Sequence, residues 1–366
     1  MTLVAPRSPV AAGTDFVAAV EGSLRRLFGA EARRWLAAAL PGGACAWTAI
    51  EDLYGYLDAI MLGGGKRLRP RFCSLGHAGV AGQNPDETDD TVVMAAAALE
   101  LLHAFALVHD DVMDGSPTRR GGPSLHARIG AEHGEQEWRG ERRRVAEGTA
   151  ILVGDLAFTL AHRLAGDLPL DARGVWHDIC AELVVGQRLD MYGAVAGARD
   201  PAYTRLVASL KSGRYTVVGP LLLGATLAGG GEQHRALFRA YGEPLGDAFQ
   251  LRDDLLGVFG DPAVTGKPVG DDLRDGSPTL LLALATQRAD AGQRRVLELI
   301  GRPDLDERDI GRIAGVLVST GARAEVERRV EVGGRAALAA LDCGPVHPDA
   351  MPGLRAAVDD ATWRER

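Results

Sequence analysis

The chain has 366 residues, of which 46% are hydrophobic and 25% charged, so it holds enough apolar material for one large or two ordinary globular domains. Its formal net charge of −8 at pH 7 argues against general binding to nucleic acid. No uninterrupted apolar stretch reaches about 18 residues, and the N-terminus lacks the basic and apolar regions of a secretory signal. We therefore expect a soluble, cytoplasmic protein without stable membrane insertion.

Helical patterns follow one another along the chain. After a flexible tail at residues 1–14, apolar residues recur with a helical period over 16–40 and 49–62. Residues 89–114 are apolar on most of their surface, which predicts a central, buried helix. A charged loop is expected at 133–144, and the later ranges expected to be helical are 147–166, 175–195, 202–230 and 234–260. A long Gly/Pro/Asp loop follows at 261–279, and the remainder is helical again.

These patterns contain no fixed-period repeat and no break in composition that would mark a second domain. We expect residues 15–366 to form a single all-α domain, a bundle of long helices around a central cavity. The four cysteines show no CxxC spacing, which argues against a zinc site or a disulfide framework. We expect buried, reduced thiols at Cys45, Cys73, Cys180 and Cys343.

Two acidic clusters end two of the apolar helices. Asp110 and Asp114 are four residues apart and so share one helix face, with Asp111 between them. Asp253 and Asp254 end another helix. Like charges at such spacing repel unless a cation bridges them, and oxygen ligands favour Mg²⁺, which often shares phosphate groups.

Adjacent aspartates are more often solvated helix ends, and further pairs occur at residues 89–90, 271–272 and 359–360. The two chosen clusters differ because each ends a long apolar helix and precedes a Gly-containing loop that carries Lys or Arg. If they face a common cavity, they predict a metal-bridged diphosphate site.

Cations gather beside glycines in the segment 63–71, GGGKRLRPR. Glycine lets a backbone approach an anion closely, and Lys66, Arg67, Arg69 and Arg71 would neutralise it. Of the 41 Lys and Arg residues in the chain, three are lysines: Lys66, Lys211 and Lys267. We interpret these as places that require a compact ammonium.

In order along the chain, GGGKRLRP, HDDVMD followed by RRGG, KSG, and FQLRDDLLGVFGD followed by TGKP resemble the motifs of the trans-isoprenyl diphosphate synthases, in particular bacterial geranylgeranyl diphosphate synthases. The resemblance runs from about residue 45 to 290 and is specific in its combination of motifs. It implies condensation of isopentenyl diphosphate with an allylic diphosphate of C5 to C15, three Mg²⁺ ions and a homodimer.

The resemblance also assigns residues. It implies a metal site with Asp110, Asp114 and Asp253 as ligands and Asp111 and Asp254 beside them. It implies allylic diphosphate contacts from Arg119, Lys211 and Lys267, and isopentenyl diphosphate contacts from Lys66, Arg69, His103 and Arg120. Ser212 and Gln250 match positions beside the forming allylic cation.

Two departures from the family pattern stand out. Ser277 replaces a second diphosphate-binding lysine, which predicts weaker allylic binding, and Gly257 replaces a third aspartate. Phe105, five residues before Asp110, and the small Ala106 go with a product of C20, geranylgeranyl diphosphate, or with farnesyl diphosphate. An ideal helix places Phe105 roughly 140° from Asp110, so an ordinary core phenylalanine is an equally open interpretation.

Three other functions remain open. A class I terpene cyclase shares metal-dependent ionisation but would not need GGGKRLRP. A phosphohydrolase of the His-Asp type is suggested by His109–Asp110 but lacks a convincing set of further histidines. A non-catalytic subunit of a heteromeric synthase would typically have lost an acidic motif, and both motifs are present.

Overall fold

The computed structural model describes residues 9–27, 33, 43–82, 90–119, 121–198, 200–260, 270–302 and 304–362. Helices dominate these ranges, which confirms the all-α prediction. The strands assigned there, β1 (Thr118–Arg119) and β2 (Gly122–Pro123), pair antiparallel in a short ribbon. Helix α1 (Pro9–Arg26) begins inside the segment expected to be a tail, and most of the expected helix beyond Arg26 lies outside the described residues.

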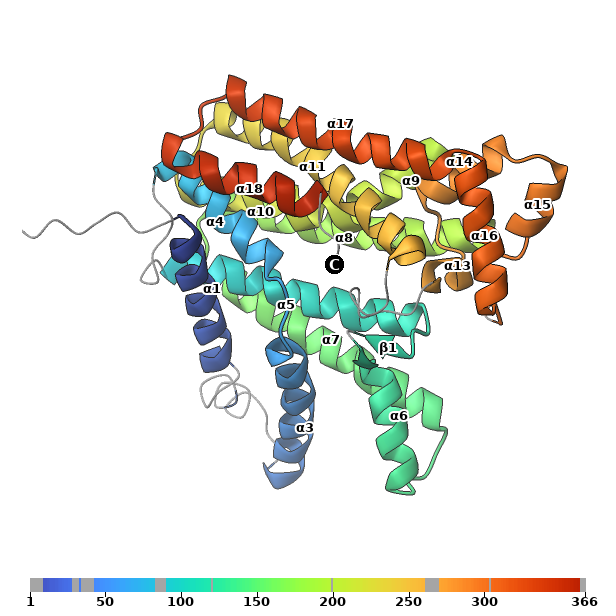
Figure 1. Ribbon diagram of the computed structural model, residues 1–366. Coiled ribbons are helices and arrows are strands. Elements are labelled where there is room, and N and C mark those ends of the chain that lie inside the picture. Colours follow the sequence, from blue (N-terminus) through green and yellow to red (C-terminus); the bar gives the residue numbers. More distant parts are fainter. Residues whose placement is uncertain are drawn as a thin grey trace, which may run out of the picture.

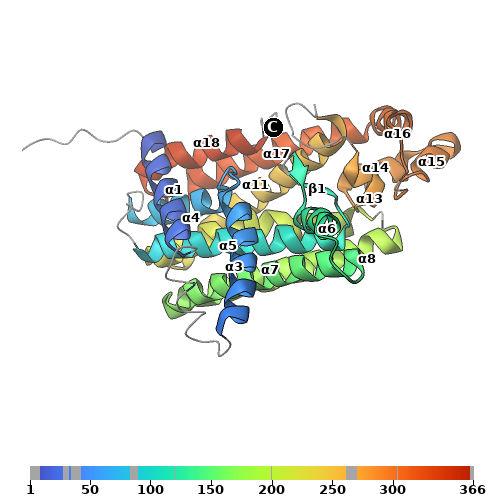
Figure 2. The same ribbon diagram turned by 90° about the horizontal axis from the view of Figure 1, so that it is seen from below.

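Helix α5 (Asp90–Met113) lies in the core, as predicted. Its alanines at 95–98 are fully buried, and such small side chains let neighbouring helices approach closely. It packs mainly on α7 (Arg142–Gly166), with further contacts from α1, α3 (Gly43–Leu62) and α4 (Leu68–Ala81). Figures 1 and 2 show α5 and α7 side by side along much of their length.

A second group of helices covers the other side of α5. It comprises α8 (Leu170–Ala196), α9 (Pro201–Ala208), the π-helix η2 (Ser209–Val218), α10 (Gly219–Leu227) and α11 (Glu232–Phe259). Glycines allow η2 to touch its neighbours: a Cβ at Gly186 of α8 would lie 2.3 Å from the Lys211 backbone nitrogen. Gly213 of η2 meets Gly246 of α11 in the same way.

The C-terminal third of the chain covers α11 and extends beyond it (Figure 1). The long helix α17 (Ala322–Cys343) packs along α11, and α18 (Met351–Thr362), which follows the short 3₁₀ turn η3 (Pro348–Ala350), packs on both. The shorter helices form a leucine-rich cluster beside them: α13 (Asp271–Asp275), α14 (Leu280–Arg288), α15 (Ala291–Leu297) and α16 (Glu307–Ser319).

Two helices, α3 and α6 (Leu125–Glu135), project from the body of the molecule (Figure 1). They are joined where Tyr56 donates a 2.5 Å hydrogen bond to Glu132. The loop expected at 133–144 is confirmed over 136–141 and wrong at both ends, because α6 continues to Glu135 and α7 begins at Arg142. The Glu141 side chain caps α7 by accepting from the backbone of Arg143 and Arg144, a role that a charge-rich run conceals.

Two helices are apolar over much of their length. Both α5 and α7 are long and apolar enough to cross a membrane by length and composition. The most apolar window of α5 is 67% buried within the protein, which is typical of a core helix, whereas that of α7 is 39% buried. Ile151 and Leu152 account for part of the exposed apolar surface of α7.

The cysteines agree with the prediction only in part. Cys73 and Cys180 are free and buried, but Cys343 is exposed at the end of α17. The side chain of Cys45 lies outside the described residues.

Candidate active site

Asp110, near the end of α5, is the centre of a charged cluster drawn from three elements. Its Oδ1 lies 2.9 Å from Nζ of Lys211 on η2 and accepts a 2.9 Å hydrogen bond from Nε2 of Gln187 on α8. The same Lys211 ammonium donates to Oδ2 of Asp190 on α8 at 2.5 Å. Lys211 is therefore shared between the first acidic motif and Asp190.

The cluster carries more negative charge than its cations balance. Burial alone would raise the pKa of Asp110, but the charge and hydrogen bond of Lys211, the charge of Arg119 and the Gln187 hydrogen bond together lower that pKa. Asp114 is exposed at the helix end, yet desolvation by its surroundings, with the negative charge of Asp110, raises its pKa to about 7. A divalent cation between these carboxylates would relieve this repulsion.

Asp111 points to a different partner. It is buried, with 3% of its surface exposed, and both Nε and Nη2 of Arg119 on β1 donate to it. Burial still raises the pKa of Asp111 above its usual value. Nη2 of Arg119 also lies 3.6 Å from Oδ2 of Asp110. The β1–β2 ribbon therefore places this arginine beside both Asp110 and Asp111.

The second acidic motif ends α11. Asp253 is exposed, whereas Asp254 is buried and accepts a 2.8 Å hydrogen bond from Nε2 of Gln250, one turn earlier. Burial raises the pKa of Asp254, and the charge of Asp190 raises it further. Asp190 also contributes to the raised pKa of Asp114, so its charge acts on both acidic motifs.

Gly257 and Ser277, the two departures from the family pattern, both lie next to Asp272. A Cβ on Gly257 would lie 2.6 Å from Oδ2 of Asp272, so the carboxylate of Asp272 occupies the space beside this glycine. Ser277 follows α13, and its backbone N–H donates to the carbonyl of Asp272 at 3.1 Å. Both departures therefore lie next to the same aspartate.

One cation of the glycine-rich segment pairs inside the protein, and two others stay candidates for binding a ligand. Arg67 is buried in left-handed backbone conformation and donates to Glu100 at 2.7 Å and to the Met61 carbonyl at 2.6 Å. It is therefore structural, which corrects the expectation that it would neutralise a ligand. Lys66 beside it is exposed, and Arg69 is buried at the start of α4.

Arg69 and His103 meet through residues that the sequence patterns did not single out. Arg69 donates to Tyr215 and, at 2.9 Å, to Thr216, both on η2. Nδ1 of His103 lies 2.8 Å from the same Tyr215 hydroxyl. Ser212, next to Lys211 on η2, is half-buried, while Arg120 and Lys267 lie outside the described residues.

Phe105 lies on the side of α5 that faces α7. Its ring centre is 4.7 Å from that of Phe158 on α7 and 4.6 Å from that of His109. Ala106 is partly buried against the same core. His109 Nε2 contacts the Ile151 carbonyl at 3.1 Å, so it faces α7 and does not join a set of paired histidines.

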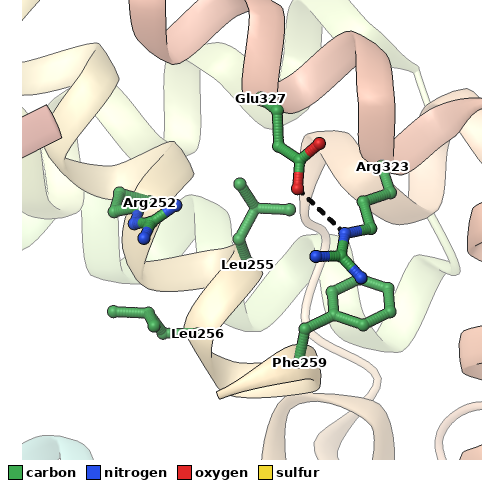
Figure 3. A pocket seen from close by; sticks show the side chains of 6 residues that line it. All are labelled: Arg252, Leu255, Leu256, Phe259, Arg323 and Glu327. Atoms are coloured by element: carbon green, nitrogen blue, oxygen red, sulfur yellow. Dashed lines mark hydrogen bonds and ion pairs between the residues drawn. The ribbon is translucent and has the colours of Figure 1, made fainter. Parts of the chain in front are cut away.

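A small pocket between α11 and α17, of about 80 Å³, lies on the other face of α11 (Figure 3). Its lining residues are Arg252, Leu255, Leu256, Phe259, Arg323 and Glu327. At about 100° per residue, Leu255 and Phe259 lie on the face of α11 opposite Gln250 and Asp254. This pocket is therefore separate from the acidic cluster.

The acidic cluster fits a hard cation chemically. Its donors are carboxylate oxygens, and burial, followed by the charge of Asp110, raises the pKa of Asp114. Among the described residues, no group of three or more acidic, histidine or cysteine side chains is already gathered closely enough to hold an ion. Lys211 and Arg119 hold Asp110 and Asp111 instead, so metal binding would exchange partners within the cluster.

The arrangement of fold and site defines a class: an all-helical protein with two acidic motifs and adjoining cations, suited to a metal-bound diphosphate. Residues 50–316 match the family model described as polyprenyl synthetase. A geranylfarnesyl diphosphate synthase of Aeropyrum pernix is 34% identical, over 73% of this chain and 79% of that protein. A geranylgeranyl diphosphate synthase of Mycobacterium tuberculosis is 32% identical, over 75% of each chain.

Among solved structures, the geranylgeranyl pyrophosphate synthase of Corynebacterium glutamicum, complexed with isoprenyl diphosphate and magnesium, superposes with a TM-score of 0.84. It is 34% identical, and the match covers 98% of both chains. The chain belongs to the polyprenyl synthetase family. Its activity is that of a prenyltransferase that elongates trans-prenyl chains, which confirms the expected class of function.

Proposed function

We propose that the protein condenses isopentenyl diphosphate head to tail with an allylic diphosphate, with Mg²⁺ as cofactor, to give a product of about geranylgeranyl length. The observation that carries this proposal is the cluster of Asp110, Lys211 and Asp190. It offers carboxylates for a metal and an ammonium for a phosphate within one network.

Bound Mg²⁺ would neutralise the diphosphate so that it can leave. Asp110, Asp114 and Asp253 would hold the metal ions, with Asp111 and Asp254 behind them. Lys211, released from Asp110, and Arg119 would donate to the departing diphosphate, together with Lys267. Family resemblance supports three ions, and the excess acidic charge supports divalent binding.

The second substrate would bind on the other side of η2. Arg69 and His103, with Lys66 and Arg120, would hold the diphosphate of isopentenyl diphosphate, and its double bond would attack the allylic cation. Ser212 and Gln250 would line the position of that cation. The new bond leaves a tertiary cation, which loses a proton to the released pyrophosphate and forms the new double bond.

The test is incubation with Mg²⁺, labelled isopentenyl diphosphate and each of the C5, C10 and C15 allylic primers, with product length read by chromatography. We expect elongation that stops mainly at C20, and loss of activity with EDTA or in Asp110→Asn. Absence of elongation with every primer would contradict the proposal. If Phe105 limits the product, Phe105→Ala yields longer chains, because the packing against Phe158 is removed.

We also propose a cytoplasmic homodimer. Helix α8 exposes an apolar stripe at helical spacing: Val184, Val185, Met191, Tyr192 and Val195. Contiguous exposed apolar side chains typically mark an interface, and a second copy of this chain is the partner that family resemblance supports. We expect light scattering to give twice the mass of one chain, and Val185→Glu to shift it toward the monomer; a monomeric wild type would contradict this.

A further inference from the structure

The hydroxyl of Tyr215 lies between two side chains from different helices. Arg69 of α4 donates to it, and Nδ1 of His103 of α5 lies 2.8 Å from it. The guanidinium carbon of Arg69 also lies 4.1 Å from the centre of the Tyr215 ring. One tyrosine on η2 thus connects the arginine and the histidine that are proposed to bind isopentenyl diphosphate.

The Tyr215 hydroxyl accepts from Arg69 and has one O–H of its own. If that O–H is directed to Nδ1 of His103, 2.8 Å away, the tyrosine bonds both side chains. Burial raises the pKa of Tyr215, so the phenol keeps this proton. A histidine that accepts at Nδ1 carries its own proton on Nε2, and Nε2 is then a donor suited to a phosphate oxygen.

Arg69 keeps unused donor capacity in this arrangement. It donates to Tyr215 and, at 2.9 Å, to Oγ1 of Thr216. Its Nε is buried without a hydrogen-bond partner. Tyr215 and Thr216 therefore orient the guanidinium without satisfying it, as expected for a group that has an anion still to bind.

The backbone that carries Tyr215 is fixed on both sides. Arg214, the preceding residue, donates to Glu182 of α8 at 2.7 Å and to Glu243 of α11 at 2.9 Å. Gly213 meets the backbone of Gly246 on α11, where a Cβ would lie 3.0 Å from the Gly246 carbonyl carbon. The π-helix is therefore a firm support from which the tyrosine can hold two flexible side chains.

We propose that Tyr215 is a positioning residue for isopentenyl diphosphate, which holds Arg69 and His103 in their binding orientation and thereby sets the affinity for this substrate. The inference rests on the proposed function, in which these two side chains bind its diphosphate. The allylic diphosphate is assigned to Lys211 and Arg119, whose ion pairs are with Asp110, Asp190 and Asp111. The effect should therefore be confined to one of the two substrates.

The experiment compares the wild type with Tyr215→Phe. We expect the KM for isopentenyl diphosphate to rise about 10-fold, as for the loss of one hydrogen bond to a charged group, with the allylic KM unchanged within about 2-fold. Calorimetry with isopentenyl diphosphate alone, in the absence of a primer, should show the same weakening of binding. The matched control is Tyr241→Phe, which removes another buried hydroxyl, bonded to the Leu354 carbonyl, and should leave both KM values unchanged.

A second variant, Thr216→Val, removes only the other contact to Arg69 and should raise the same KM by less than Tyr215→Phe does. The inference would be overturned if Tyr215→Phe changed the KM for isopentenyl diphosphate and the allylic KM equally. It would also be overturned if neither Tyr215→Phe nor Thr216→Val changed the KM for isopentenyl diphosphate. A wild type that elongates no primer would instead overturn the proposed function. The two failures are therefore distinguishable.

Discussion

Replacing Asp190 by asparagine should weaken metal binding. Lys211 is shared between Asp110, at 2.9 Å, and Asp190, at 2.5 Å. Without the charge of Asp190, the ammonium pairs with Asp110 alone and competes more strongly with Mg²⁺. The substitution also removes a negative charge near the expected metal site, which lowers the affinity for Mg²⁺ further.

The magnitude follows from the geometry. Two charges about 4 Å apart interact by about 4 kcal/mol at an effective dielectric constant of about 20. Lys211 and Asp190 are 27% and 14% exposed, so solvent screening reduces the effect to about 1 kcal/mol. We therefore expect the Mg²⁺ concentration for half-maximal rate to rise about 5-fold in Asp190→Asn.

The assay must separate this effect from a change in protonation. Asp190 also contributes to the raised pKa of Asp114, after desolvation and the charge of Asp110, so its removal would ease metal binding near neutral pH. At about pH 8, Asp114 is mostly ionised in both proteins, and the competition by Lys211 is measured alone. Mn²⁺ binding, followed by electron paramagnetic resonance without substrates, gives a second readout.

Asp178→Asn is the matched control, because it removes the same charge from an exposed position on α8. It lies about 18 Å along the helix from Asp190, beyond the screening length at physiological salt. If the two variants titrate identically with Mg²⁺ at pH 8, the sharing of Lys211 has no part in metal binding.

Three further outcomes are expected. Mg²⁺ affinity should increase about 10-fold per pH unit as the pH rises toward about 7, the pKa of Asp114, because the proton competes with the metal for this carboxylate. Above that pH the affinity should level off. A Mg²⁺ affinity that calorimetry finds constant from pH 6 to 8 would contradict this. Arg67→Ala should lower the urea-unfolding free energy by about 3–5 kcal/mol, because it leaves Glu100 buried and unpaired, whereas the exposed Arg71→Ala should cost less than about 0.5 kcal/mol. Ser277→Lys should lower the allylic KM by up to about 10-fold and leave that for isopentenyl diphosphate unchanged, and an unaltered allylic KM would show that no contact is missing there.

The sequence predicts the helical architecture and the acidic motifs well, because both depend on local spacing. The period of 3.6 residues locates α5, and the interval from Asp110 to Asp114 places both carboxylates on one face. The scarcity of lysine points to Lys211, which the structure brings to Asp110. The positions of Arg120 and Lys267 stay predictions.

The partners of these residues were missed because they depend on packing between helices. Gln187 and Asp190 belong to what reads as an ordinary amphipathic helix, and Tyr215 to an apolar run. A signal was present: Gly186 precedes Gln187, and small residues beside polar ones often mark a close helix contact. Arg67 was misjudged because only its left-handed backbone, with φ of 48°, turns it inward to Glu100.

The width of η2 has a consequence for how this segment tolerates change. A π-helix makes i→i+5 hydrogen bonds, so it contains more residues per turn than the α-helices that flank it. Deleting one of the three residues between Lys211 and Tyr215 would turn these two side chains relative to each other by about the angle of one residue, roughly 100° in an α-helix. Lys211 and Tyr215 could then no longer face their respective partners together. The spacing between them, more than the identity of the intervening side chains, keeps both sets of partners in place.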